Sequence, residues 1–154
     1  SVMSIVAEHD GFMTASSTQG LGSEFKIFLP VETGELLKED IPPLAPGAIL
    51  TVDDDRTNQR IYRATFRNDN SFGVHSGNAA VQAVKENPGK IKVILMDMNM
   101  PGFTMEESLR ELRELDPSLR IHIITGDTTL KSTPGADSVV HKPINMAVIS
   151  ELVK

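Results

Sequence analysis

From residue 48 onward, short apolar runs alternate with segments whose apolar residues recur at helical spacing. The clearest run covers residues 93–96 and leads directly into Asp97, and Pro101 ends any regular structure soon afterwards. A continuous apolar run of this length is typical of a strand buried on both faces, as in a parallel sheet. By the same reasoning, the sequence predicts five strands, over residues 48–52, 72–75, 93–97, 121–125 and 138–141.

The segments that connect these strands predict helices over residues 57–66, 78–85 and 105–115, and a last helix that Asn145 caps. Thr104 and Glu107 have the spacing of a capping box at the start of the third helix. The residues predicted to face inward are Ile61, Tyr62, Thr65 and Phe66 in the first helix, Met105, Leu109, Leu112 and Leu115 in the third, and Val148, Ile149 and Leu152 in the last.

Strands separated by helices predict an α/β fold with a doubly wound, five-stranded parallel sheet and right-handed crossovers. One connection differs from the others. Residues 127–137 are few and include Pro134 and Gly135, so the helix expected there is shortened or missing.

The first 46 residues have a different character. Residues 1–9 predict the end of a helix, and residues 12–17 and 24–29 predict two strands joined by a glycine-containing turn. Residues 31–46 are acidic and then rich in proline, which predicts an extended, semi-rigid linker without a helix. We therefore expect an N-terminal helix and β-hairpin appendage over 1–30, a linker over 31–46 and a main domain over 47–154. Because the chain begins in mid-pattern, we expect it to be a piece of a longer protein.

Composition narrows the possible functions. The net charge is −6 and the pI is about 5.2, which argues against a nucleic-acid partner because phosphate binding needs clustered Lys and Arg. The absence of cysteine excludes disulfides, zinc–thiolate sites and thiol nucleophiles. No apolar run reaches membrane-spanning length, so we expect no direct membrane insertion of this segment and a cytoplasmic location, compatible with a membrane anchor elsewhere in a parent chain.

Five polar residues follow or end the predicted strands: Asp53, Asp54, Asp97, Thr125 and Lys142. Because the carboxyl ends of parallel strands meet at one edge of a sheet, we expect these side chains to gather there. Three carboxylates so close would repel each other unless a cation lay among them, and Mg²⁺ suits oxygen ligands of this kind. A lysine adds a mobile positive charge that can pair with a phosphoryl group. The set has the parts that phosphoryl transfer requires.

Four motifs lie at the ends of the predicted strands: Val52-Asp53-Asp54-Asp55, Leu95-Met96-Asp97-Met98-Asn99-Met100-Pro101, Ile124-Thr125-Gly126 and His141-Lys142-Pro143-Ile144. With these motifs, residues 48–154 resemble the receiver domain of two-component systems. The resemblance implies a flavodoxin-like fold in which Asp97 is the phosphoacceptor, Thr125 and Lys142 contact the phosphoryl oxygens, and Mg²⁺ is bound by Asp53, Asp54, Asp97 and the backbone carbonyl of Asn99. It also implies a histidine kinase or a histidine phosphotransfer protein as partner, and a domain that catalyses its own phosphoryl transfer and hydrolysis.

The N-terminal segment carries a second resemblance. The Gly20-Leu21-Gly22-Ser23-Glu24-Phe25 stretch, followed by Phe28-Leu29-Pro30, is similar to the C-terminal end of the ATPase domain of sensor histidine kinases. The asparagine and aspartate–glycine boxes of that family are absent, so we expect no ATP binding by this remnant. The order of the two segments implies the receiver of a hybrid sensor histidine kinase. The apolar face of the hairpin could also pack on the receiver or support a dimer by exchange between two chains.

Other interpretations stay open. The three consecutive aspartates could be the acidic start of a helix, and Thr125 and Lys142 could be a buried β-former and a solvated loop lysine. A degenerate receiver that acts as a docking module without phosphorylation is suggested by the missing helix and by Val139, which stands where the receiver family has an aromatic switch residue. A haloacid-dehalogenase-like phosphatase would need a second aspartate two residues after Asp97, where this sequence has Asn99.

Overall fold

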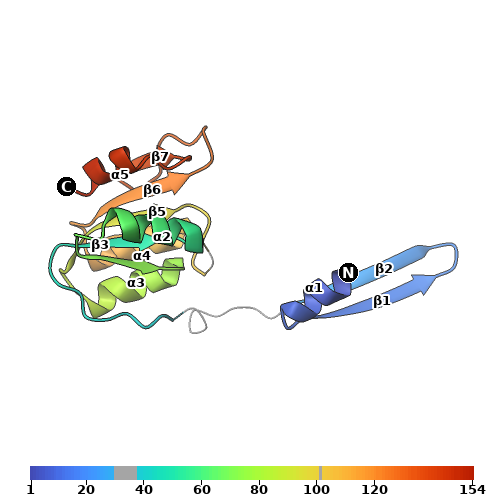
Figure 1. Ribbon diagram of the computed structural model, residues 1–154. Coiled ribbons are helices and arrows are strands. Elements are labelled where there is room, and N and C mark those ends of the chain that lie inside the picture. The colour runs from blue at the N-terminus through green and yellow to red at the C-terminus, as the bar shows by residue number, and fades with distance from the viewer. Residues whose placement is uncertain (30–37, 101) are drawn as a thin grey trace. The chain divides into compact units, whose positions relative to one another are not determined.

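The computed structural model describes residues 1–29, 38–100 and 102–154 (Figure 1). The chain divides into two compact units, Ser1–Thr33 and Gly34–Lys154. No helix among the described residues is long and apolar enough to cross a lipid bilayer.

The second unit is built on a five-stranded sheet in which every neighbouring pair of strands is parallel. The strand order is β4-β3-β5-β6-β7 (Figure 1). The first of these strands in the sequence, β3, therefore lies inside the sheet, and the later strands extend the sheet to both edges. This arrangement brings the carboxyl ends of all five strands to one edge, as the sequence predicts. The strands are β3 (Ala48–Val52), β4 (Ser71–Val74), β5 (Ile91–Asp97), β6 (Arg120–Thr125) and β7 (Ser138–His141).

Helices cover both faces of this sheet, and a separate apolar core lies between the sheet and the helices on each face. Helices α3 (Gly77–Glu86) and α4 (Met105–Leu115) contribute to one buried cluster, and α2 (Arg56–Thr65) and α5 (Met146–Leu152) to the other. The central strands β3 and β5 supply residues to both clusters, which explains why apolar residues follow one another in them without alternation, at 48–50 and 93–96. The predicted doubly wound α/β fold is therefore confirmed.

Each of these helices begins with a side chain that caps free backbone N–H groups. The Thr104 hydroxyl accepts a hydrogen bond from the Glu107 amide, and the Glu107 carboxylate accepts one from the Thr104 amide, which confirms the predicted capping box. Asn145 caps α5 by accepting from the amide of Ala147, also as predicted. Asp55 and Ser76 cap α2 and α3 in the same way.

Three residues predicted to face inward are exposed instead: Ile61, Leu115 and Val148. The buried stripe of α2 runs through Gln59, Tyr62 and Phe66. Because each helical residue advances by about 100°, Ile61 falls on the other side of the helix from Gln59 and Phe66. Leu115 is the last residue of α4, and Val148 precedes the fully buried Ile149.

The connection from β6 to β7 contains no helix, in agreement with the expectation that the helix there is shortened or missing. Arg113 of α4 ties this connection down by donating to the Gly135 carbonyl and to an Asp137 carboxylate oxygen, each at 2.8 Å. The same Asp137 oxygen accepts from the amide of Ile121 at 2.7 Å. One arginine and one aspartate thus hold the loop against the sheet.

Residues 38–46 of the predicted linker are free of helix, but they are not a free-standing spacer. The backbone of Glu39 exchanges two hydrogen bonds with the side-chain amide of Gln82 on α3, at 3.1 and 2.8 Å. The amide of Leu44 donates to Asn87 at 2.7 Å, and the side chains of Ile41 and Leu44 pack against the core. The other half of the linker, residues 31–37, lies outside the described residues.

The first unit is the predicted helix and hairpin: α1 (Val2–Glu8) followed by the antiparallel strands β1 (Phe12–Thr18) and β2 (Gly22–Phe28). The rings of Phe12 and Phe28 stack with their centroids 4.6 Å apart. Among its described residues only Val6 is buried, because two strands and one short helix cannot enclose a core. Several large apolar side chains are therefore exposed, among them Met3, Phe12, Leu21, Phe25 and Ile27.

Candidate functional site

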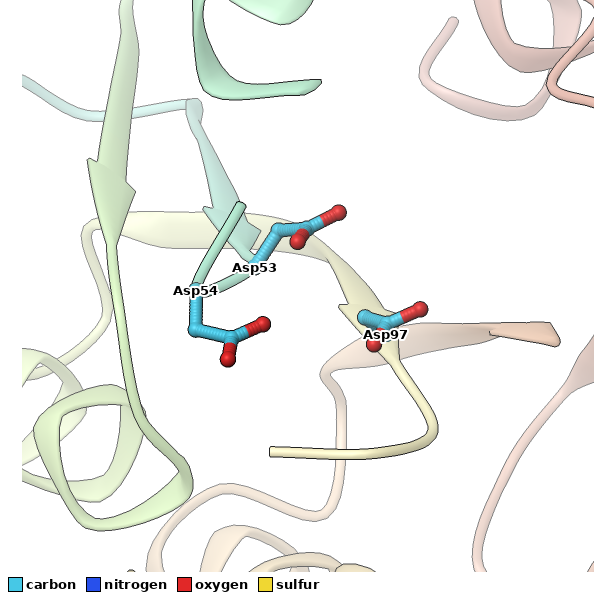
Figure 2. A group of neighbouring side chains, drawn as sticks. All are labelled: Asp53, Asp54 and Asp97. Atoms are coloured by element: carbon cyan, nitrogen blue, oxygen red, sulfur yellow. The ribbon is translucent and has the colours of Figure 1, made fainter. Parts of the chain in front are cut away.

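Three carboxylates meet at the carboxyl edge of the sheet. Asp53 and Asp54 follow β3, and Asp97 is the last residue of the adjacent strand β5. Each offers one oxygen to a group whose members all lie within 4.8 Å of one another (Figure 2). Asp53 and Asp97 are buried, whereas Asp54 is exposed and leaves one side of the cluster open to solvent.

Asp53 is held in place by the start of α2. Its two carboxylate oxygens accept hydrogen bonds from the Asp55 amide at 2.9 Å and from the Asn58 side chain at 3.0 Å. Burial raises the pKa of Asp53, the two hydrogen bonds oppose this, and the charge of Asp97 raises it further, so the net shift is upward. A positive charge in the cluster would stabilise the ionised form of Asp53 and oppose this rise of its pKa.

Lys142 reaches the cluster from the far side of β6. It follows β7, and its Nζ lies 2.6 Å from Oδ1 of Asp97. The hydrogen bond to Asp97 raises the pKa of Lys142, against the effect of its partial burial. Its backbone is fixed by a hydrogen bond from the Lys142 amide to the Thr125 carbonyl at 2.7 Å, and the Lys142–Pro143 peptide bond is cis.

Thr125 ends β6, and its side chain is buried beside the loop that follows β5. Its hydroxyl donates to the Met98 sulfur at 3.1 Å and accepts from the Asp127 amide at 3.0 Å. The proton of the Thr125 hydroxyl is therefore already used in the hydrogen bond to Met98 in this structure. Asn99 touches the site through its amide, which donates to Oδ2 of Asp97 at 3.3 Å.

The structure thus brings together the carboxylates of Asp53, Asp54 and Asp97 with the lysine predicted to face them. Carboxylate oxygens around an opening to solvent fit a hard divalent cation that keeps several water ligands, which is the preference of Mg²⁺. Burial of Asp53 and repulsion among the three carboxylates both disfavour the ionised forms. A divalent cation bound between the carboxylates would offset both effects. The part of Asn99 as a carbonyl ligand stays a prediction.

Two supporting residues escape sequence reasoning. Asn58 holds Asp53, and the buried Gln59 fastens strand ends together: its amide donates to the carbonyls of Val74 at 2.8 Å and Asp53 at 3.1 Å. Its oxygen accepts from the Thr51 hydroxyl at 2.8 Å. Once Asp55 is recognised as the cap of α2, the first turn of that helix must lie beside Asp53, and this could have indicated Asn58. No sequence pattern indicates in the same way that the side chain of Gln59 is buried and bonded to the strand ends.

Comparison with known proteins places the chain in a family. The response regulator receiver domain family matches residues 49–154. The chain is 26% identical over 174 residues to the sensor kinase CckA of Brucella abortus, covering 99% of this chain and 18% of that protein. It is 27% identical over 158 residues to the aerobic respiration control sensor protein ArcB of Escherichia coli, covering 94% and 20%. The chain therefore spans about a fifth of the length of these relatives.

Solved structures show the same fold. A response regulator receiver domain protein of Clostridium thermocellum has a TM-score of 0.63 and 25% identity, covering 71% of this chain and 91% of that one. The receiver domain of a sensor histidine kinase of Pseudomonas aeruginosa, solved with a magnesium ion in its active-site cleft, has a TM-score of 0.62 and 24% identity, covering 71% and 95%. Together with the parallel sheet and the carboxylates at its edge, the family match establishes that this chain belongs to the response regulator receiver domains of two-component systems.

Proposed function

We propose that this receiver takes a phosphoryl group from a phosphohistidine onto Asp97, with Mg²⁺ as cofactor. The observation that carries the proposal is the contact between Lys142 Nζ and Asp97 Oδ1 within a cluster of three carboxylates. A structural ion pair would not need two further carboxylates beside it. A phosphoacceptor site needs a nucleophile, ligands for a cation and a mobile positive charge, and these are the groups present.

In the proposed step, a carboxylate oxygen of Asp97 attacks phosphorus and the phosphorus–nitrogen bond of the donor breaks. The electron pair stays with the imidazole nitrogen, which takes a proton from solvent. Asp53, Asp54, Asp97 and the carbonyl of Asn99 would hold Mg²⁺, which supplies positive charge beside the phosphoryl oxygens. Hydrolysis of the acyl phosphate returns the carboxylate.

Two side chains change partner in this scheme. Lys142 is partly exposed and lies at the end of a flexible stem, so it moves from the Asp97 oxygen to a phosphoryl oxygen. Thr125 releases the Met98 sulfur and donates its hydroxyl to the phosphoryl group, which is a stronger acceptor than a thioether. The phosphorylated state is then distinguished by the positions of Thr125 and Lys142.

The donor that we propose is a histidine kinase or a histidine phosphotransfer protein, and the parent chain is a hybrid sensor histidine kinase. The similarity to sensor kinases supports this, since it extends across the N-terminal unit as well as the receiver. In that parent, residues 1–30 are the end of an ATPase domain. The other parts of that ATPase domain would cover the apolar side chains that the hairpin exposes, such as Phe25 and Ile27.

A docking module without phosphorylation is the second candidate. It is favoured by the helix-free connection over 126–137 and by Val139, both of which alter the part of a receiver that follows Thr125. Neither feature touches the carboxylates or Lys142, so the acceptor function remains our first choice.

Labelling with phosphoramidate, a small phosphodonor, separates the two candidates. The wild-type chain should gain one phosphoryl group in the presence of Mg²⁺, detected by intact mass, and should gain none with EDTA. The Asp97→Asn variant should stay unlabelled, while Asp69→Asn, a change at an exposed aspartate away from the site, should label normally. A folded wild-type protein that takes up no phosphoryl group would leave only the docking function.

A further inference from the structure

Three methionines lie together beside the proposed phosphoacceptor. They line one hollow of about 490 Å³, whose lining residues are Met98, Met100, Met105, Asn99, Thr104 and Glu106. The three methionines are half-buried and the other three residues are exposed, so a small solute can reach the thioethers from solvent. The chain has seven methionines and no cysteine, and its sulfur chemistry is therefore that of thioethers alone.

The sulfur of Met98 contacts a residue of the proposed site. Met98 directly follows Asp97, and its amide donates to the Ile124 carbonyl at 2.9 Å, which fixes its backbone beside β6. Its sulfur accepts the proton of the Thr125 hydroxyl, with 3.1 Å between oxygen and sulfur. A threonine hydroxyl has one proton to donate, so this sulfur and a phosphoryl group on Asp97 compete for it. The acceptor strength of Met98 therefore decides how readily Thr125 turns to the phosphoryl group.

A peroxide changes that acceptor strength. The sulfur lone pair of a methionine attacks one oxygen of hydrogen peroxide, the oxygen–oxygen bond breaks and a sulfur–oxygen bond forms. The departing hydroxide takes the proton from the transferred oxygen and leaves as water, so sulfur is oxidised by two electrons and the peroxide is reduced. The product is a sulfoxide, whose polar oxygen accepts hydrogen bonds more strongly than a thioether does.

We infer that Met98 is a site of reversible oxidation, and that its sulfoxide slows phosphoryl transfer to Asp97 by retaining the Thr125 hydroxyl. This inference rests on the proposed function. Oxidation leaves the carboxylate cluster and the contact between Lys142 and Asp97 in place, because other side chains make them. The modified receiver therefore keeps its nucleophile and its cation ligands and loses one hydrogen bond to the phosphoryl group. A methionine sulfoxide reductase reverses the change by returning the thioether.

The test maps the oxidised residues and measures phosphorylation on the same samples. The chain is treated with hydrogen peroxide, its peptides are sequenced by mass spectrometry, and labelling by phosphoramidate with Mg²⁺ is timed by intact mass. Met98 should carry a sulfoxide, and the labelling rate should fall by roughly 10-fold, because a hydrogen bond to a charged group is lost. Methionine sulfoxide reductases A and B should restore the rate, since they reduce the two sulfoxide epimers.

Three variants separate Met98 from the other methionines, each compared with its own untreated sample. In Met98→Leu, peroxide should leave the labelling rate unchanged. The matched control is Met100→Leu/Met105→Leu, which removes the other two sulfurs of the hollow and should be slowed by peroxide as much as the wild type. Thr125→Val keeps the Met98 sulfur but lacks the hydroxyl, so peroxide should slow it no further.

Equal slowing of Met98→Leu by peroxide would overturn the inference, and so would equal slowing of Thr125→Val. An unchanged rate in a wild-type chain whose Met98 is fully oxidised would contradict it as well. The same holds for a Met98 that stays reduced while Met100 and Met105 are oxidised, and for unfolding of the oxidised chain, which Tyr62 fluorescence would report. A wild-type chain that phosphoramidate does not label before peroxide treatment would instead refute the proposed function.

Discussion

Lys142 Nζ and Asp97 Oδ1 lie 2.6 Å apart although their strands, β7 and β5, are separated by β6. The contact is possible because all three strands are parallel and end at the same edge of the sheet. Asp97 is buried and Lys142 is partly open to solvent, so the lysine is the partner that can move. In our account, this ion pair is the resting arrangement of a phosphoacceptor and its counter-charge.

Removing the lysine should slow phosphorylation without removing the acceptor. We expect Lys142→Ala to lower the rate of labelling by phosphoramidate by roughly a hundredfold or more, because a positive group aimed at the transferring phosphoryl oxygens is lost. Lys142→Arg keeps the charge and should recover part of the rate. Quenched-flow labelling followed by intact mass measures both. Wild-type rates in Lys142→Ala would show that the ion pair serves structure only.

Mg²⁺ should stabilise the folded receiver through Asp54. With free Mg²⁺ at about one hundred times its Kd, the free energy of unfolding should rise by about 2.7 kcal/mol. Fluorescence of Tyr62, the sole tyrosine and a buried residue of the receiver, reports this transition. Asp54→Ala should lose most of the Mg²⁺ effect, whereas Asp69→Asn should keep it. An equal Mg²⁺ effect in Asp54→Ala would place the cation elsewhere.

The receiver should lose stability in mild acid because of His122. This side chain is buried, with its Nδ1 at 2.7 Å from the Ser138 hydroxyl. Burial lowers the pKa of His122 below its usual 6.5, Asp137 opposes the shift, and Arg120 adds to it. Below pH 6.5 the unfolded chain therefore binds more protons than the folded one, and the free energy of unfolding falls as pH decreases towards the folded-state pKa.

Urea unfolding followed by Tyr62 fluorescence at several pH values checks this expectation. In His122→Gln the part of the pH dependence between pH 6.5 and the folded-state pKa should disappear. His9→Gln, which changes a residue of the other unit, should retain it. A wild-type stability that does not change across this range would contradict a buried, neutral His122.

Docking of residues 38–46 on α3 should contribute to the stability of the receiver. Gln82 makes both hydrogen bonds to the backbone of Glu39, and Gln82→Ala should lower the free energy of unfolding by about 1–3 kcal/mol. The measurement is urea unfolding, with Lys85→Ala as a control at an exposed position of the same helix. Faster proteolysis within residues 38–46 should accompany the loss. An unchanged stability would mean that this segment only rests on the surface.

Local patterns in the sequence predicted the strands, the caps Thr104 and Asn145, and the carboxylate cluster. Asp97 is recognisable because four apolar residues precede it, and Asp53 and Asp54 follow a strand that is apolar except for Thr51. Contacts set by packing were not predictable in this way. Ile61 has the character of a core residue in the sequence, but α2 buries Gln59 and Tyr62 and leaves Ile61 exposed. The hydrogen bond between Glu39 and Gln82 joins residues that are 43 positions apart, so no local pattern indicates it. The Thr125–Met98 contact depends on side-chain rotamers that no spacing encodes.

The most direct test of the account is to locate the phosphoryl group on the chain. The protein is labelled with phosphoramidate and Mg²⁺ and then treated with borohydride, which reduces an aspartyl phosphate to homoserine, and its peptides are sequenced by mass spectrometry. We predict homoserine at position 97 alone, and none after labelling in EDTA. Homoserine at Asp53 or Asp54, or a labelled protein in which Asp97 stays intact, would contradict the assignment of Asp97 as the acceptor.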